Sequence, residues 1–304
     1  MTDMTSYLGW KTDFAHPAGE PAFHGPDSVQ WRIFKNPVAL AIGGVAAVLM
    51  EFADPRIRSG VWDHSAFKQD PIGRSRRTAV AAMVGVYGPQ SAARRVIQGV
   101  TNMHAHVSGE TPSGEAYRAL DPELLDWVAA TAGYGFLIAY DRFVAPVSAA
   151  DKNRFLREGE VVARLYGVQQ APHSEADFLA MADALSPRFE PHPIIDEFLA
   201  MIRSGKAAPG TPKVLHRALA RAAVSILPPV VADKLAFGPE YRLSGFDRTM
   251  LKAFGQMAER IALRSSAPCQ ASVRLGLPWN FLYLGRDAQA RLLAGAASLD
   301  IEPA

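Results

Sequence analysis

Apolar positions along the chain recur mainly at steps of three and four residues, the period of an amphipathic helix. Residues 79–87 ("AVAAMVGVY") and 92–104 ("AARRVIQGVTNMH") follow this spacing and do not alternate strictly, as a half-buried strand would. We find no series of β-branched runs separated by hairpin turns, so a substantial sheet is not expected. The pattern predicts an all-α protein.

Start and stop signals predict the individual helices. Asp121 as N-cap and Pro122 at the first helical position begin a helix over 122–143 that is apolar on most sides and therefore buried. Ser148 caps a second helix, which ends at the C-cap Gly167. The same periodicity predicts four further helices, within 174–185, 193–205, 213–227 and 246–266.

The most apolar run, from Val38 to Met50, is shorter than the roughly 18 to 20 residues that cross a bilayer, so it predicts a buried helix. The N-terminus lacks the basic and apolar regions of a signal peptide. We therefore expect no transmembrane segment and a cytoplasmic location.

The domain organisation is expected to be simple. Residues 1–36 are rich in Gly, Pro and Asp, which favours a segment that wraps over the surface. Residues 37–304 then form a single helical domain, and 204–213 ("SGKAAPGTPK") is the best candidate for a surface link within it.

Composition narrows the function classes. The 304-residue chain is 49% hydrophobic and 20% charged, with a formal net charge of +2, which argues against a nucleic-acid partner. Its one cysteine, Cys269, excludes a disulfide framework, is consistent with a reducing compartment and receives no catalytic role.

Two histidines one residue apart, His104 and His106, are the first candidates for chemistry. On a strand both would point to one side, but on a helix they lie roughly 200° apart and cannot share one metal. His104 continues the apolar stripe of Ala93, Val96, Ile97 and Val100, whereas His106 continues the polar set of Arg95, Gln98 and Asn102. We therefore expect His104 to point inward and His106 outward.

An inward histidine has several interpretations. It can be a core residue hydrogen-bonded to a backbone carbonyl. It can be the single axial ligand of a haem iron in an apolar pocket. A zinc site would need three or four converging ligands, for which Glu51, Asp63 and His64 are available, but no zinc-binding spacing such as HExxH is present.

A basic group precedes these histidines. Arg74, Arg77 and Thr78 share one face of a helix that is expected to start near Arg74, after a turn at Asp70-Pro71 and Gly73. Three arginines in four residues are typical of a solvated helix start. Such a patch near a helix N-terminus can also bind carboxylates, including haem propionates.

Two segments in this order, 63–78 ("DHSAFKQDPIGRSRRT") and 103–128 ("MHAHVSGETPSGEAYRALDPELLDWV"), resemble the DUF2236 family of MpaB-type oxygenases and latex-clearing rubber oxygenases. The resemblance runs from about residue 38 to about residue 170, with weaker likeness in 226–243. It implies a helical fold with a globin-like core that holds one haem b. The family pattern His-x-x-Val-x-Gly then makes His104 the axial ligand of the haem iron.

The family's Arg-x-x-Lys/Arg-Thr motif falls on Arg74, Arg77 and Thr78, which the resemblance places at the distal side of the haem. Three positions depart from relatives. Arg77 replaces a lysine of the latex-clearing enzymes and cannot ligate iron, because arginine stays protonated. Asp54-Pro55 stands where many relatives have His-Pro, and Ala129 where many have histidine.

The first functional hypothesis is a haem-dependent oxygenase that uses O2 on an apolar, unsaturated substrate, isoprenoid or lipid-like. Arg74 or Arg77 would stabilise the bound oxygen, and Thr78 would add a hydroxyl. Asp63 and His64 are the polar pair nearest in sequence for a catalytic base. The alternatives are a non-catalytic haem-binding sensor or carrier, and a helical interaction protein without haem.

Overall fold

The computed structural model describes residues 6–7, 10–11, 13–64, 70–205 and 213–299. In these ranges it contains fourteen α-helices and two short antiparallel hairpins, so the prediction of an all-α protein is confirmed. The globin-like arrangement of the core stays a prediction. The helices are α1 (Val29–Phe34), α2 (Pro37–Ala53), α3 (Pro55–His64), α4 (Pro71–Tyr87), α5 (Gln90–His104), α6 (Pro122–Phe143), α7 (Ala149–Leu165), α8 (Glu175–Leu185), α9 (Pro193–Ser204), α10 (Lys213–Ser225), α11 (Pro229–Leu235), α12 (Gly245–Ala258), α13 (Ala267–Arg274) and α14 (Arg286–Leu299).

Short elements connect these helices. Three 3₁₀ turns follow α8, α11 and α13, at Ser186–Arg188, Pro239–Tyr241 and Phe281–Tyr283. The hairpins are β1 (Ser6–Tyr7) with β2 (Trp10–Lys11), and β3 (Ser108–Glu110) with β4 (Ala116–Arg118). In the second hairpin Gly109 lies opposite Tyr117.

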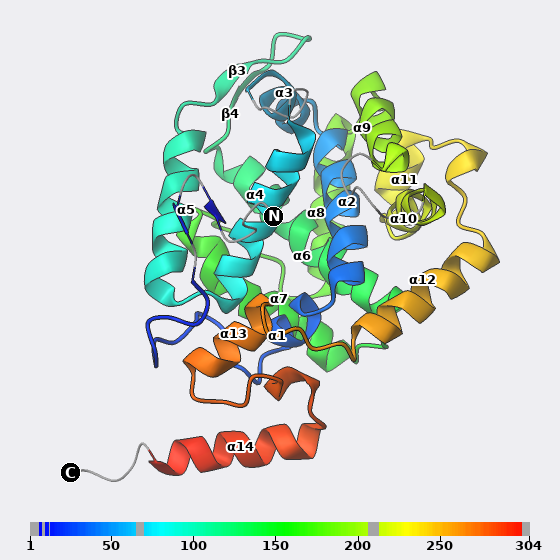
Figure 1. Cartoon of the computed structure of the whole chain (residues 1–304). Helices are drawn as coiled ribbons and strands as arrows, with labels where there is room; N and C mark the ends of the chain where they lie inside the picture. Colours follow the sequence, from blue (N-terminus) through cyan, green and yellow to red (C-terminus); the bar gives the residue numbers. More distant parts are fainter. Residues whose placement is uncertain (1–5, 8–9, 12, 65–69, 206–212, 300–304) are drawn as a thin grey trace.

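The helix pair α2 and α6 forms the centre of the molecule (Figure 1). The two backbones approach closely at Gly43 and Gly135. A Cβ atom added at Gly43 would lie 2.6 Å from the carbonyl oxygen of Gly135, and one added at Gly135 would lie 2.5 Å from that of Gly43. Only glycine permits this approach at either position. As predicted, α2 is a largely buried helix.

A buried polar cluster ties the start of α2 to the end of α12. The Asn36 side chain accepts hydrogen bonds from the backbone N–H groups of Val38 and Ala39 and donates one to the carbonyl of Gly255. Glu259 lies 3.0 Å from the Lys35 ammonium and accepts a hydrogen bond from the Tyr140 hydroxyl at 2.8 Å. Each buried polar group in this cluster therefore has a partner.

The N-terminal segment differs from the surface strap predicted for residues 1–36. Residues 29–34 form α1, and Trp31 and Ile33 are fully buried in the core. Ser28 caps this helix by accepting the backbone N–H of Trp31. The sequence pattern did not predict this helix, because it is short and lies in a stretch whose Gly and Pro content favours a loop.

Other predicted boundaries shift slightly. Helix α4 begins at Pro71, and not near Arg74, because the Asp70 carboxylate caps it by accepting the Gly73 N–H at 2.8 Å. Helix α12 ends at Ala258, well before residue 266. The predicted helix over 122–143 is confirmed. The predicted helix that Ser148 caps is also confirmed, and it ends just before Gly167. The predicted link at 204–213 lies largely outside the described residues.

No single helix in the described part of the chain is long and apolar enough to cross a membrane. Two sharply bent helix pairs, α2 with α3 and α10 with α11, meet that test by length and composition alone. In the pair that contains α2, most of that helix is buried within the protein.

Candidate functional site

The two histidines of the 104–106 segment differ in exposure. His104 is the last residue of α5 and is half-buried, whereas His106 follows the helix and is exposed. On the same helix Val96, Ile97 and Val100 are buried, and Arg95, Gln98 and Asn102 are exposed. The helical period therefore separates the two sides of α5 as the sequence predicted.

Arg74, in the first turn of α4, carries a positive charge that acts on His104. Burial and the charge of Arg74 both lower the pKa of His104 below the usual value of 6.5. The neutral imidazole is therefore the favoured form at neutral pH, and this is the form that ligates a metal. Arg74 itself is half-buried.

Glu51, in the last turn of α2, is the second group on which Arg74 acts. Burial raises the pKa of Glu51 to about 7, and the charge of Arg74 and the Thr131 hydroxyl oppose this rise. The Thr131 hydroxyl lies 3.4 Å from a carboxylate oxygen of Glu51. Arg74 of α4 thus lies within electrostatic reach of two groups on other helices, the imidazole of His104 on α5 and the carboxyl of Glu51 on α2.

Sequence reasoning did not assign Glu51 a role in proton transfer and considered it only as a zinc ligand. The signal was available, because Glu51 is the one charged residue within α2. Burying a lone carboxyl on an otherwise apolar helix costs desolvation free energy, and few structural roles would offset that cost.

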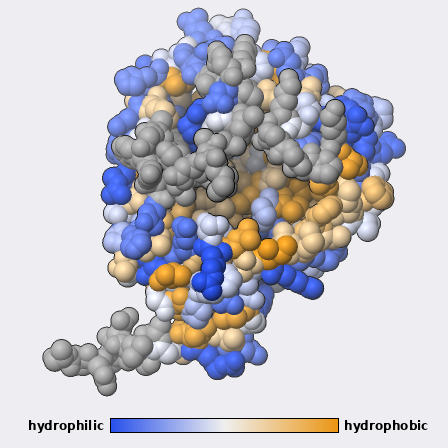
Figure 2. Space-filling model, viewed as in Figure 1, coloured by the Kyte–Doolittle hydropathy of each residue, from blue (hydrophilic) through white to orange (hydrophobic). Residues whose placement is uncertain are grey.

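One face of α2 is partly exposed. Beyond residue 40 the helix has four residues that are not buried, Ala41, Gly44, Val48 and Glu51, at steps of three, four and three. This spacing puts them on one side of the helix. Figure 2 shows a hollow with a hydrophobic floor in the region where Figure 1 shows α2. Glu51 is the polar member of this otherwise apolar face.

Arg77 and Thr78 lie farther toward solvent. The Arg77 guanidinium lies 3.5 Å from the carboxylate of the N-cap residue Asp70, and both side chains are substantially exposed. Thr78 is exposed. The pairing of Arg77 agrees with a solvated helix start, so of the two arginines only Arg74 is electrostatically coupled to His104 and Glu51.

Asp63 and His64 contact the β3–β4 hairpin. Both are exposed at the end of α3, and the His64 Nε2 atom lies 3.2 Å from the Tyr117 hydroxyl. Burial and the charge of Asp63 raise the pKa of Tyr117. The polar pair therefore packs against the hairpin, and the structure gives it no contact with His104.

Packing explains why Val107 and Gly109 occupy the Val and Gly positions of the His-x-x-Val-x-Gly pattern. A Cβ added at Gly109 would lie 2.7 Å from the Tyr117 hydroxyl, so a side chain there would displace the tyrosine. A Cβ added at Gly60 of α3 would lie 3.8 Å from a methyl group of Val107. These two positions hold the hairpin against α3, and His104 is the member of the pattern that is left for chemistry.

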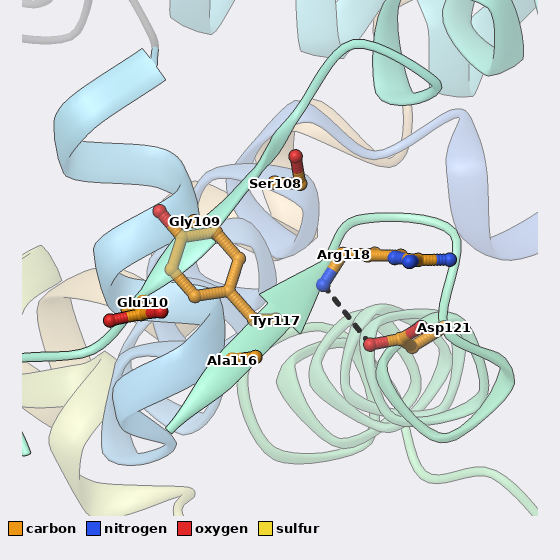
Figure 3. Close-up of a pocket in the computed structure, with 7 residues that line it drawn as sticks. All are labelled: Ser108, Gly109, Glu110, Ala116, Tyr117, Arg118 and Asp121. Carbon is orange, nitrogen blue, oxygen red and sulfur yellow. Dashed lines mark hydrogen bonds between the residues drawn. The ribbon is translucent and has the colours of Figure 1, made fainter. Parts of the chain in front are cut away.

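An open depression of about 390 Å³ lies beside the hairpin, lined by Ser108, Gly109, Glu110, Ala116, Tyr117, Arg118 and Asp121 (Figure 3). The Asp121 carboxylate accepts a hydrogen bond from the Arg118 backbone N–H at 3.0 Å (Figure 3). Most of its lining side chains are exposed, and it contains none of Glu51, Arg74 and His104. It is a surface feature of the hairpin and not an apolar substrate pocket.

Metal ligation by protein groups alone has no support in the part of the chain that the structure describes. There, no three His, Cys, Asp or Glu side chains converge in a way that could hold an ion. The zinc interpretation, which needed Glu51, Asp63 and His64 together, is therefore not supported.

Comparison with known proteins gives the family. No curated protein and no solved structure matches the chain. Residues 31–260 match the family described as "ER-bound oxygenase mpaB/B'/Rubber oxygenase, catalytic domain". This match covers about three quarters of the chain and includes Glu51, Arg74 and His104. The chain therefore belongs to the mpaB and rubber oxygenase family, and its residues 31–260 are an oxygenase catalytic domain.

Proposed function

We propose that the protein is a haem b-dependent oxygenase that uses O2 to oxidise or cleave an apolar, unsaturated substrate, isoprenoid or lipid-like. The observation that carries this proposal is the electrostatic coupling of Arg74 to both His104 and Glu51, beside a partly exposed apolar face of α2. One cation thus acts on both a potential metal ligand and a carboxyl, and the carboxyl belongs to an otherwise apolar helix face to which an apolar molecule could bind.

The residues present fit a haem. His104 offers a neutral imidazole at the end of a helix, and no second protein ligand is needed on that side of the iron. The guanidinium of Arg74 suits a propionate carboxylate or an oxygen that gains negative charge. When bound, the haem supplies the binding and activation of O2.

The cation in this site is arginine, which sets what it can do. Arg74 remains protonated and donates hydrogen bonds without competing with His104 for the metal. A fixed donor that faces developing negative charge in a site with little water stabilises that charge strongly. Arg77 and Thr78 follow Arg74 on the same helix face and can extend this donor set, although both lie closer to solvent.

Glu51 is our choice for the proton acceptor, in place of Asp63 and His64. A carboxyl with a pKa of about 7 is about half ionised at neutral pH, and its carboxylate is a stronger base than that of an ordinary glutamate. The Thr131 hydroxyl, which donates to the Val128 carbonyl at 2.9 Å, lies 3.4 Å from a Glu51 carboxylate oxygen. Asp63 and His64 are exposed and face the hairpin, so they lack the desolvation that gives Glu51 this basicity.

The apolar face of α2 accounts for the substrate class. Ala41 and Gly44 are small, and Val48 lies one turn before Glu51. Such a surface binds a hydrocarbon chain by releasing water and leaves room along the helix. The bound hydrocarbon would then present a carbon–hydrogen bond to the Glu51 carboxylate at the end of the apolar face.

The test is turnover. We would supply the purified protein with haemin and a chemical reductant, incubate it with isoprenoid and unsaturated fatty substrates under isotopically labelled O2, and then analyse products by mass spectrometry. Carbonyl or hydroxyl products that carry the label are expected. A haem absorption band without turnover on any substrate would favour a sensor or carrier, and a colourless protein would refute the proposal.

A further inference from the structure

Helix α12 carries an apolar stripe that faces away from the core. Five of the nine large hydrophobic side chains that are exposed in the described part of the chain lie within residues 246–263. Phe246 is 70% exposed and Met257 is 52% exposed, and Phe254, Ile261 and Leu263 are also exposed. Phe246, Met250, Phe254 and Met257 follow steps of four, four and three, so they form one stripe along the helix.

The buried side of α12, next to the stripe, fixes this orientation. Asp247, Leu251 and Gly255 are buried. Asp247 accepts a hydrogen bond from the Arg221 guanidinium at 2.9 Å, and a side chain at Gly255 would collide with the carbonyl of Phe143. The helix therefore cannot rotate to bury the stripe without breaking an ion pair and a close backbone contact.

Basic residues dominate the exposed charges of the segment that carries the stripe. Between residues 242 and 264 the two acidic side chains are engaged with cations, Asp247 with Arg221 and Glu259 with Lys35. The five basic residues of this segment are exposed: Arg242, Arg248, Lys252, Arg260 and Arg264. A stripe of aromatic and aliphatic side chains beside exposed lysine and arginine is typical of helices that lie in the plane of a membrane interface.

We propose that α12 and the turn that follows it dock the protein on the surface of an anionic lipid bilayer. Phe246, Met257 and Leu263 would enter the boundary between headgroups and acyl chains, and the basic side chains would contact lipid phosphates. A second copy of the chain is a poorer occupant, because the same basic residues would then oppose one another. This inference does not depend on the proposed haem chemistry.

The position of the stripe agrees with this partner. In Figure 2 hydrophobic surface follows the region of α12 and reaches toward the hollow over α2. A protein docked through α12 would therefore hold that hollow close to the bilayer, where apolar molecules dissolve.

The experiment is flotation of the full chain with vesicles of phosphatidylcholine alone, and of equal parts phosphatidylcholine and phosphatidylglycerol. We expect binding to the mixed vesicles at least about tenfold tighter than to the neutral ones, and weaker binding at high salt. Phe246→Ser combined with Met257→Ser should weaken binding to mixed vesicles about tenfold or more. Arg242→Gln, Arg260→Gln and Arg264→Gln together, at the two ends of the stripe, should remove the preference for anionic lipid.

A matched control uses exposed valines on other helices. Val161→Ser with Val273→Ser, on α7 and α13, removes two exposed apolar side chains elsewhere on the surface and should leave vesicle binding unchanged. Circular dichroism checks that each variant is folded, and sedimentation in solution reports self-association. Equal losses for control and stripe variants, no binding to either vesicle, or dimers that the stripe variants dissociate would each overturn the proposal.

Discussion

The positive charge of Arg74 in α4 acts on His104 at the end of α5 and keeps the pKa of that imidazole, already lowered by burial, below 6.5. The two residues are thirty positions apart in the chain. This coupling favours the neutral imidazole, which is the form that the proposed ligation of a haem iron requires.

Haem ligation is the first prediction. His104→Ala should remove nearly all of the Soret absorbance of haemin-loaded protein, because it deletes the residue proposed to hold the iron. His106→Ala should keep this absorbance within about twofold of the parent, because His106 is exposed beyond the helix end. Absorption titration with haemin measures both variants. The opposite order would show that the iron binds the other side of the segment.

Proton transfer by Glu51 gives the second prediction. Glu51→Gln should lower the oxygenation rate by about 100-fold while haem absorbance is retained, because the amide cannot accept a proton. In the parent the rate should rise with pH through about 7, as the carboxyl ionises. Rates across this pH range with a fixed substrate provide the measurement. An unchanged rate in Glu51→Gln would exclude it as the base.

The raised pKa of Glu51 also predicts how stability depends on pH. The Glu51 carboxyl binds its proton more tightly in the folded protein than in the unfolded chain, where its pKa is near 4.5. The stabilisation of the folded state by protonated Glu51 is therefore complete below pH 4.5 and is lost as pH rises through about 7. Without haem, Glu51→Gln should be more stable than the parent at pH 8 by about 1–2 kcal/mol. Urea unfolding at several pH values tests this, with Glu110→Gln, an exposed carboxylate on β3, as the control.

The crossing of α2 and α6 gives a matched pair of glycine variants. Gly43→Ala should lower the free energy of unfolding by about 2–4 kcal/mol, because its methyl group meets the Gly135 backbone at 2.6 Å. Gly44→Ala should be neutral or stabilising by up to about 1 kcal/mol, since its nearest neighbour is a Phe136 ring atom at 3.8 Å. Denaturant unfolding compares the two. Equal effects would mean that α2 and α6 are not in close contact.

Buried Arg274 provides the last prediction. Its guanidinium donates hydrogen bonds to the backbone carbonyls of Phe14, Glu20 and Tyr87, at 2.6, 2.8 and 2.8 Å. Arg274→Met should lower the free energy of unfolding by about 3–5 kcal/mol, because three carbonyls lose their donor. Arg95→Met, at an exposed position of α5, should change it by about 0.5 kcal/mol or less. Thermal and denaturant unfolding would show whether the two variants differ.

The predicted helices and the different exposure of the two histidines followed from local signals. Caps such as Ser148 act within one turn, and the 3.6-residue period separates His104 from His106 on a single helix. The buried helix α1 was missed, because six residues give too little periodicity to stand out from a loop rich in Gly and Pro.

The sequence by itself determined that this protein is helical, that His104 lies on the less exposed side of its helix, and that its motifs resemble those of an oxygenase family. Only the tertiary structure decided which charges act together. It brought Glu51 and Arg74 within electrostatic reach and left Asp63 and His64 at the hairpin. The physical reason is that the helical period acts over a few residues. Which side chains of α2, α4 and α5 come near one another depends instead on how the buried faces of the helices pack, and the glycine crossing of α2 and α6 is part of that packing.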